Sequence, residues 1–415
     1  MSGSRPALWV VATALALMLG LQPVTTDLYL PALPGIQQDL QAPMAGLQLT
    51  MSALILSFGL AQLVWGPISD RWGRRPVLRL ALVLYVCASL GCALASDIDW
   101  LVALRAAQGA TLAAVVMIGR AMVRDLYEPI EGAQVMSRGM SGLGIIAIAS
   151  MPLGGALAGL WGWRANLLAV ASIGLGVLVF VSLRLPETLR QRQLQALQPG
   201  PLLRTMGRIT RHPGFRAWAL LVSCTYAGLF TLLATSSFVF IRTLGLSPMA
   251  YGIVLSSNSL AYLLGTVLCR RWIARRGLLA TVRRGAFFTL AGSVALLVVA
   301  FLPAFFETPP TAATTTAALL LSLCLYAVGH GIHQPCGQTG AVGPFPDSAG
   351  TASALAGAVL ALTAFAIGLV LGSAFDGSVR FMSIGIALAG LVTTLVAWTL
   401  VQRHGATRAE PAPAP

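Results

Sequence analysis

The sequence predicts an all-α membrane protein with twelve transmembrane helices in two pseudo-symmetric six-helix bundles. The chain of 415 residues is 57% hydrophobic and only 10% charged, whereas a soluble domain of this size carries roughly 25% charged residues. Apolar runs of about 20 residues, the length that crosses a bilayer, follow one another along almost the whole chain. The two halves also repeat a charged loop pattern at an offset of about 200 residues.

The apolar runs place the helices in order along the chain. We expect them at 7–27, 45–67, 77–96, 99–121, 133–160 and 163–183, then at 214–241, 249–270, 284–303, 315–341, 350–374 and 380–401. The longest polar connector separates the two sets. We therefore predict an N-terminal bundle (1–183), a cytoplasmic linker (184–213), a C-terminal bundle (214–401) and a disordered Pro/Ala-rich cytoplasmic tail (402–415).

The basic residues indicate the orientation of the chain in the membrane. All 27 are arginines, and 23 of them fall in alternate loops or at the two ends of the chain. The positive-inside rule then puts both termini and the central linker in the cytoplasm. The net charge of +14 therefore does not indicate a nucleic-acid partner, which would need basic residues gathered on one soluble face.

The loop after the second span, GPISDRWGRRPVL (66–78), has more pattern than an orientation signal needs. Gly66 and Gly73 permit close approach and a tight turn, and Asp70 stands at a helix end. The arginines of the loop could reach acidic groups at neighbouring helix ends, and Asp125 is such a group. We predict that these residues form a conformational latch of Gly66, Asp70, Arg71, Gly73, Arg74, Arg75 and Asp125.

A looser copy of that loop, RRWIARRG (270–277), follows span eight, with Arg270 where the first copy has its aspartate. Two related bundles around a midplane cavity are typical of secondary transporters. The first loop resembles the signature loop of the major facilitator superfamily. TTDLYLPALPGI (25–36), LRAAQGA (104–110), VRDLY (123–127) and AGTASALAG (349–357) resemble its Bcr/CflA (bicyclomycin/chloramphenicol resistance) branch of drug:proton antiporters. This resemblance implies the major facilitator fold.

Two charges fall within or at the end of predicted spans. Arg105 lies inside span four, where a charge is costly unless it is paired or solvated, and Asp27 at the outer end of span one is its natural partner. The resemblance implies that this pair couples proton movement to transport. The simpler alternative is that Asp27 is an interfacial residue or a helix cap.

The chain departs from the family pattern in two places. Some multidrug relatives carry a second acid in span one, whereas here Gln22 is the only strongly polar residue of that region, so neutral or zwitterionic substrates are favoured. The antiporter motif of span five has Pro152 two residues before Gly154 and Gly155 rather than three, so the helix bend is shifted. Gly155 and Gly159, four residues apart, are expected to let helices pack closely.

The resemblance also implies which spans line the cavity. On those spans we expect substrate contacts from polar, aromatic and Met side chains: Gln22, Tyr29, Met51, Phe58, Tyr226, Phe230, Phe238, Asn258, Tyr262, His330, His333 and Gln334. Each of these could instead be a packing residue. His330 and His333 are spaced to share a helix face, and a secondary proton role is open to them. No carboxylate or thiolate completes a metal site beside them, so no metal is expected.

The sequence contains no P-loop and no catalytic triad pattern, so we expect neither an enzyme nor a cofactor. We expect a monomeric, multi-pass protein of the bacterial inner membrane that exports small amphipathic, drug-like compounds in exchange for protons. Two alternatives remain: a proton-coupled exporter of a metabolite such as an amino acid, sugar or siderophore, and an uncoupled facilitator or sensor.

Overall fold

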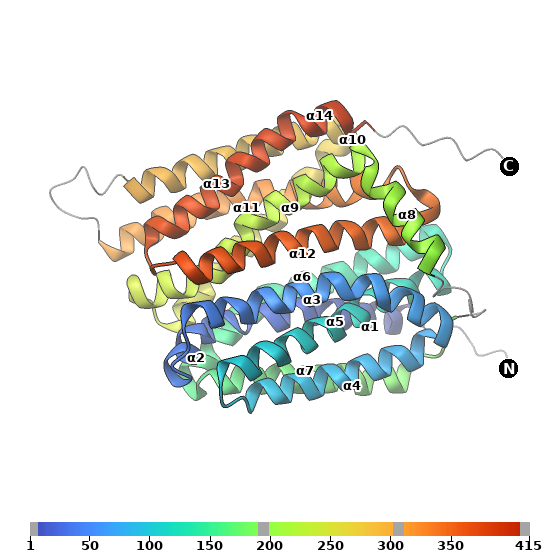
Figure 1. Ribbon diagram of the computed structural model, residues 1–415, viewed down its shortest axis with the longest axis horizontal. Coiled ribbons are helices and arrows are strands. Elements are labelled where there is room, and N and C mark those ends of the chain that lie inside the picture. The colour runs from blue at the N-terminus through green and yellow to red at the C-terminus, as the bar shows by residue number, and fades with distance from the viewer. Residues whose placement is uncertain (1–6, 190–198, 302–310, 407–415) are drawn as a thin grey trace. The chain divides into compact units, whose positions relative to one another are not determined.

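The computed structural model describes residues 7–189, 199–301 and 311–406, and in these ranges every regular element is a helix (Figure 1). The chain divides into two compact units. Unit 1 comprises Met1–Gln198 with Pro248–Gly252, and unit 2 comprises Pro199–Ser247 with Ile253–Pro415. Residues 248–252, at the start of the eighth predicted span, are thus grouped with unit 1 rather than with the C-terminal bundle expected for them.

Unit 1 contains seven α-helices and a short 3-10 turn. They are α1 (Leu8–Asp27), η1 (Leu30–Ala32), α2 (Leu33–Asp39), α3 (Met44–Trp72), α4 (Arg74–Ala93), α5 (Ile98–Leu126), α6 (Pro129–Trp161) and α7 (Trp163–Arg184). Helix α3 packs along α5, α1 along α6, and α4 along both α5 and α7. Between them lies a core of aliphatic side chains from α1, α4, α5 and α7.

Unit 2 begins with a short amphipathic helix. Its elements are α8 (Pro199–Arg211), α9 (Pro213–Ser237), the π-helical η2 (Phe238–Thr243), α10 (Pro248–Phe301), α11 (Ala312–Val342), η4 (Pro346–Ser348), α12 (Ala349–Ala374), α13 (Val379–Trp398) and α14 (Leu400–His404). Helix α9 is the centre of the unit, because α11, α12 and α13 all pack against it.

Among the described residues, eleven helical segments are long and apolar enough to cross a membrane. One of them, α10, has 54 residues and a non-helical backbone at Gly277. At 1.5 Å per residue it measures about 80 Å, more than twice the ~30 Å of a bilayer core. It therefore supplies two crossings, which brings the total to the twelve that the sequence predicts.

The predicted connector and tail have more structure than their composition indicates. Residues 184–213 include α8, which belongs to unit 2. The tail begins inside α14, and residues 407–415 lie outside the described part of the chain.

The inter-helix turns follow from local chemistry. Gly73 and Gly162 adopt φ of 104° and 78°, in the left-handed region that favours glycine, and so allow α3 to turn into α4 and α6 into α7. Asp97 caps α5, because its carboxylate accepts a hydrogen bond from the Trp100 amide at 2.9 Å. The turn at Gly73 places the charged residues of the 66–78 loop at the adjoining ends of α3 and α4.

Candidate substrate and proton site

Arg105 lies on α5 in the interior of unit 1, with no exposed surface. Its Nη1 donates to Gln108 Oε1 at 2.7 Å and to the Thr25 carbonyl at 3.2 Å, and its Nε donates to the Thr50 carbonyl at 3.4 Å. The guanidinium carbon stands 4.1 Å from the centre of the Tyr29 ring. The charge is thus held by neutral acceptors and a π face.

The expected ion pair between Asp27 and Arg105 is not formed in this conformation. Among the described residues no carboxylate lies within ion-pair distance of Arg105, and the Asp27 carboxylate accepts instead from the Thr26 hydroxyl at 2.8 Å. Asp27 is half-buried at the last position of α1, two residues beyond the Thr25 carbonyl that Arg105 holds. The two charged groups are therefore linked through the end of α1 rather than by direct contact.

A polar network that the sequence reading missed surrounds Arg105. Gln108, which orients the guanidinium, donates from its Nε2 to Ser89 Oγ at 2.7 Å. The hydroxyls of Thr25 and Tyr85 lie 2.5 Å apart. Gln108 is the Gln of the LRAAQGA stretch. Because it lies one helical turn after Arg105, its contact with Arg105 could have been predicted from the sequence. Ser89 and Tyr85, on α4, carry no comparable signal in an apolar run.

The N-terminal substrate candidates differ in their surroundings. Tyr29 is fully buried and donates to Thr50 Oγ1 at 2.7 Å. Met51 is also buried, with its sulfur 3.8 Å from Arg105 Nη2. Phe58 is partly buried against the hydrophobic core of the unit, and Gln22 is half-buried on α1. Tyr29 and Met51 are thus brought directly to the arginine.

The two histidines of α11 contact different helices. The His330 ring lies 5.5 Å from the Tyr262 ring, and its Nδ1 is 3.1 Å from Thr225 Oγ1. His333 is fully buried, with its Nε2 3.2 Å from the Val282 carbonyl. His330 therefore belongs with α9 and the first part of α10, and His333 with the part of α10 beyond Gly277.

The other C-terminal candidates include two amide side chains with unsatisfied oxygens. The carbonyl oxygens of Asn258 and Gln334 are buried and have no hydrogen-bond partner among the described residues. Phe230 and Phe238 are buried apolar residues, and Phe238 packs edge-on against Phe375 at 6.1 Å. Tyr226 is half-buried on α9. Buried amide oxygens without partners are costly, so Asn258 and Gln334 are the strongest ligand candidates of this set.

The predicted latch has Arg74 at its centre. Arg74 Nη2 lies 2.6 Å from Asp70 Oδ1, Nε lies 3.0 Å from Asp125 Oδ2, and Nη1 donates to Ser69 Oγ at 2.6 Å. One nearly buried guanidinium thereby joins the ends of α3 and α5 to the start of α4. Charge-assisted bonds of this kind are roughly twice as strong as neutral ones.

Glu187 is a member of this cluster that the sequence reading missed. Its carboxylate accepts from the backbone amides of Arg74 at 3.0 Å and Arg75 at 3.1 Å, where the start of α4 leaves amides unpaired. The Thr188 hydroxyl donates to Asp125 Oδ2 at 3.2 Å. The sequence shows Glu187 only as an acid just after span six. It lies in a stretch with the composition of a linker, so nothing there indicates a role in the latch.

The remaining latch residues have unequal roles. The φ of Gly73 requires glycine, and a Cβ there would lie 2.7 Å from Glu187 Oε2, so it would also displace that carboxylate. A Cβ on Gly66 would meet only Met117 Sδ at 3.6 Å, an ordinary contact, so the close approach expected there is absent. Arg71 is exposed and forms no ion pair within the described part of the chain.

The glycines of α6 only partly follow the expectation of close helix packing. A Cβ on Gly154 would lie 2.8 Å from Leu28 Cα, and Asn166 Nδ2 donates to the Gly154 carbonyl at 2.8 Å, so backbone meets backbone there. Gly155 is buried as well. At Gly159 the expectation is wrong, because a Cβ there would meet nothing within 4 Å. Pro152 stands inside the helix, two residues before the first of these glycines.

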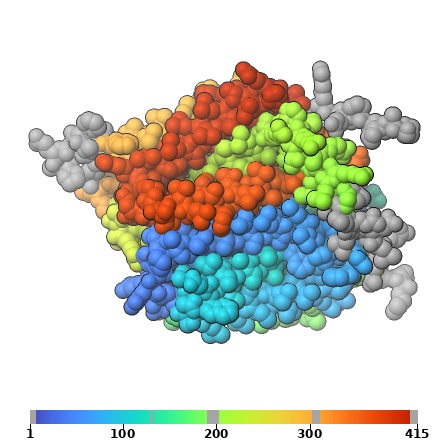
Figure 2. All heavy atoms as spheres, in the orientation of Figure 1, coloured from blue at the N-terminus to red at the C-terminus, as the bar shows by residue number. Residues whose placement is uncertain are grey.

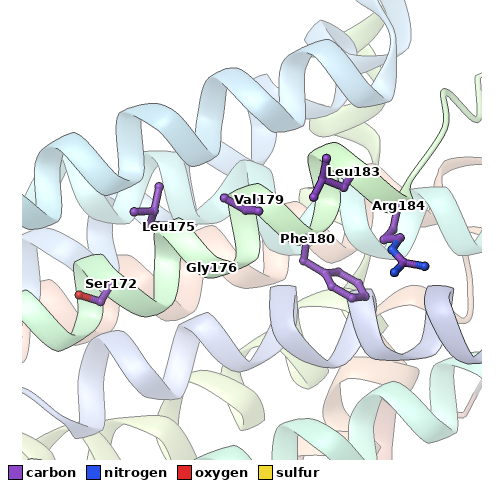
Figure 3. Close-up of a pocket in the computed structure, with 7 residues that line it drawn as sticks. All are labelled: Ser172, Leu175, Gly176, Val179, Phe180, Leu183 and Arg184. Atoms are coloured by element: carbon purple, nitrogen blue, oxygen red, sulfur yellow. The ribbon is translucent and has the colours of Figure 1, made fainter.

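A shallow groove of about 580 Å³ follows α7, and none of the residues described above lines it. Figure 3 shows Leu175, Val179 and Leu183 on one side of the helix and Phe180 and Arg184 on the other, with Ser172 and Gly176 completing the lining. The lining is mostly apolar and belongs to a predicted span, so we read it as a lipid-facing surface. No group of three or more metal-ligating side chains occurs among the described residues.

Comparison with known proteins gives a consistent family match. The profile of the Major Facilitator Superfamily matches residues 15–368. The uncharacterized MFS-type transporter YdgK of Bacillus subtilis (strain 168) is 30% identical over 83% of this chain and 85% of its own length. Multidrug resistance protein D of Escherichia coli (strain K12) is 29% identical over 83% of each chain. The chloramphenicol resistance protein of Pseudomonas aeruginosa is 28% identical over 79% of this chain and 75% of its own.

The fold also matches solved structures. The crystal structure of the D-xylose-proton symporter superposes with a TM-score of 0.75 at 16% identity, covering 96% of this chain and 99% of that one. Identity at this level supports the fold alone. The expected twelve-helix fold and the resemblance found in the sequence are thereby confirmed.

Proposed function

Because the chain belongs to the Major Facilitator Superfamily, we propose that this multi-pass membrane transporter exports small amphipathic, drug-like compounds in exchange for protons. Relatives named for multidrug and chloramphenicol resistance support the substrate class. The observation that carries the proposal is the fully buried Arg105 with no carboxylate at ion-pair distance among the described residues, beside a helix that ends in Asp27. A buried charge without a counter-ion is expensive even when neutral groups solvate it, and it marks a functional position.

The proposed coupling acts through the end of α1. Arg105 holds the Thr25 carbonyl, and Asp27 lies two residues further on. An ionised Asp27 makes this end of α1 electrostatically favourable for the guanidinium, and protonation removes that attraction. Substrate and proton then compete for the same arrangement of α1 and α5, which is the requirement for antiport.

Each unit has its own proposed substrate contacts. In unit 1 the proposed contacts are Gln22, Tyr29, Met51 and Phe58. In unit 2 they are Tyr226, Phe230, Phe238, Asn258, Tyr262, His330, His333 and Gln334. Aromatic rings supply apolar surface, and the amide oxygens of Asn258 and Gln334 accept hydrogen bonds from the substrate. The absence of a second acid near Gln22 favours neutral or zwitterionic compounds.

The latch would stabilise one conformation of the cytoplasmic helix ends. Arg74 bridges Asp70 and Asp125, and Glu187 ties the start of α4 to the chain beyond α7. Breaking these charge-assisted bonds and re-forming them would be part of each cycle. The arginine distribution supports cytoplasmic termini in a bacterial inner membrane, and we propose that the protein works as a monomer.

Transport by the purified protein in proteoliposomes tests the proposal. A pH gradient is imposed across the liposome membrane, and a panel of drug-like compounds is added outside. Drug uptake and internal pH are then recorded together. The proposal predicts uptake of at least one amphipathic compound against its gradient, driven by the proton gradient and accompanied by proton movement the other way. Drug flux that ignores the gradient would identify an uncoupled facilitator. Coupled flux of amino acids, sugars or siderophores but of no drug would identify a metabolite exporter.

A further inference from the structure

The two units differ in how they neutralise their arginines. In unit 1, Arg74 bonds to Asp70 and Asp125, and Glu187 holds the following turn. Among its described residues, unit 2 has thirteen arginines but only two acidic residues, Asp347 and Asp376. The second copy of the charged loop has Arg270 where the first has Asp70. Unit 2 therefore concentrates positive charge that its own carboxylates do not balance.

The first part of this charge is on α8. Its arginines recur at spacings of four and three, so Arg204, Arg208 and Arg211 share one helix face, and all three are exposed. Ile209, on the opposite face, is fully buried where α8 packs against α9 and α12. A basic face opposite a packed apolar one is the pattern of helices that lie at a membrane surface.

Contacts fix α8 at the level where the spans of unit 2 begin. Arg208 Nη2 donates to Ser348 Oγ at 3.2 Å, immediately before α12. The His212 ring, at the start of α9, packs edge-on against Phe345 at 5.2 Å. Figure 2 shows α8 at the surface beside the start of α12. The arginine face is therefore held near the boundary between lipid and water.

The second part of the charge lies on residues 270–284, here called the α10 bend. Since α9 crosses the membrane once and α10 returns, the bend emerges on the same side as α8. Arg270, Arg271, Arg275, Arg276 and Arg283 are all exposed there. Trp272 packs with Phe288 at 6.3 Å and lies 6.0 Å from the Arg284 guanidinium, and tryptophan is enriched at the headgroup level of membranes.

We propose that α8 and the α10 bend together form a surface of unit 2 that binds anionic phospholipid headgroups. This goes beyond the proposed transport activity and rests only on the proposed topology. No carboxylate pairs with the arginines of α8 or the α10 bend in the described part of the chain, so phosphate groups of the cytoplasmic leaflet supply the missing negative charge. Arginine suits this role because its planar fork binds phosphate oxygens in pairs.

The test measures lipid affinity rather than transport. The purified full-length protein is titrated with phosphatidylglycerol or phosphatidylcholine in neutral detergent, and bound lipids are counted by native mass spectrometry. Wild type is expected to prefer phosphatidylglycerol. The variant R204Q/R208Q/R211Q should lose roughly a hundredfold in phosphatidylglycerol affinity at low salt, from about 1 kcal/mol for each arginine. A variant with unchanged phosphatidylglycerol affinity would overturn the proposal.

Two further variants separate charge from folding. R204K/R208K/R211K keeps the charge and should retain most of the preference for phosphatidylglycerol. R242Q/R380Q removes two exposed arginines from the opposite end of the same unit and should leave the preference unchanged. A comparable loss in R242Q/R380Q, or a loss in the lysine variant as large as in the glutamine one, would contradict the proposed headgroup-binding surface. Full competition by soluble glycerol phosphate would show a free-phosphate site and also overturn the lipid assignment.

Discussion

The guanidinium of Arg105 lies over the ring of Tyr29, with the guanidinium carbon 4.1 Å from the ring centre. Both side chains are fully buried, and the Tyr29 hydroxyl is anchored to Thr50 at 2.7 Å. The ring thus supplies part of the stabilisation that a carboxylate would otherwise give a buried cation. It also leaves the arginine free of a permanent ion pair, so its electrostatic balance can respond to proton and substrate.

A pair of substitutions at Tyr29 and one at Arg105 test this arrangement. Tyr29→Phe keeps the ring and should retain most transport, whereas Tyr29→Leu removes the π face and should reduce it strongly. Arg105→Lys keeps the charge but cannot reproduce three separated hydrogen bonds, so we expect a loss of roughly tenfold or more in transport rate. The measurement is drug flux in proteoliposomes at matched protein content. Equal activities of Tyr29→Phe and Tyr29→Leu would remove the ring from the account.

Gly73→Ala should destabilise the protein for two reasons. Its φ of 104° is unfavourable for alanine, and the added Cβ would lie 2.7 Å from Glu187 Oε2. We expect a cost of about 1–3 kcal/mol, measured as a lower Tm in detergent. Gly277→Ala has a similar φ of 75° but open space around the Cβ, so it should cost less.

Gly159→Ala is the matched control for those two. It lies within a helix with no neighbour within 4 Å, so the substitution should leave stability unchanged or raise the free energy of unfolding by up to about 1 kcal/mol, seen as an equal or slightly higher Tm. A drop at Gly159 as large as at Gly73 would contradict the structural explanation.

Removing any of three carboxylates of the latch cluster should slow transport. Asp125→Asn and Asp70→Asn each remove a carboxylate from Arg74, and Glu187→Gln weakens the anchor of the next turn. All three should slow transport several-fold while leaving expression near wild type, because the bonds break and re-form in the cycle. Arg71→Gln, in the same loop but exposed, should transport normally. Wild-type rates in Asp70→Asn and Asp125→Asn would reduce the loop to a connector.

The fold was predictable from the sequence because hydropathy and arginine placement are properties of whole segments. The order of the twelve spans and the two units needs no side-chain detail. Arg74, Asp70 and Asp125 were also predictable as a group, since helix ends on one side of a bundle are close together. Glu187 was not, because its role depends on how the chain leaves α7 and folds back on α4.

The expected Asp27–Arg105 ion pair, which the structure does not form, shows a second limit of prediction from sequence. Sequence reasoning pairs opposite charges in a membrane because bare charges are costly. Here Gln108, two backbone carbonyls and the Tyr29 ring satisfy the arginine instead. Backbone acceptors have no residue signature, so only the structure reveals them.

The two histidines should respond differently to substitution. His330 contacts Thr225 and the ring of Tyr262, and Tyr262 is itself a substrate candidate. His330→Asn should therefore weaken drug binding with little change in Tm. His333 is also a proposed substrate contact, but it is fully buried and bonded to the Val282 carbonyl, so His333→Asn should in addition lower Tm and expression. Drug affinity by tryptophan quenching and Tm by differential scanning fluorimetry separate the two effects. The reverse pattern would exchange their roles.

The central claim is that Asp27 carries the proton that the substrate displaces. Lightly buffered, detergent-solubilised protein is mixed with a transported drug while a pH dye records released protons. Wild type should release protons in proportion to bound drug, with the largest signal at a pH where Asp27 is partly protonated. Asp27→Asn should bind the drug but release none, and Asp99→Asn, an exposed acid in the first turn of α5, should behave like wild type. Proton release of wild-type size from Asp27→Asn would contradict the account.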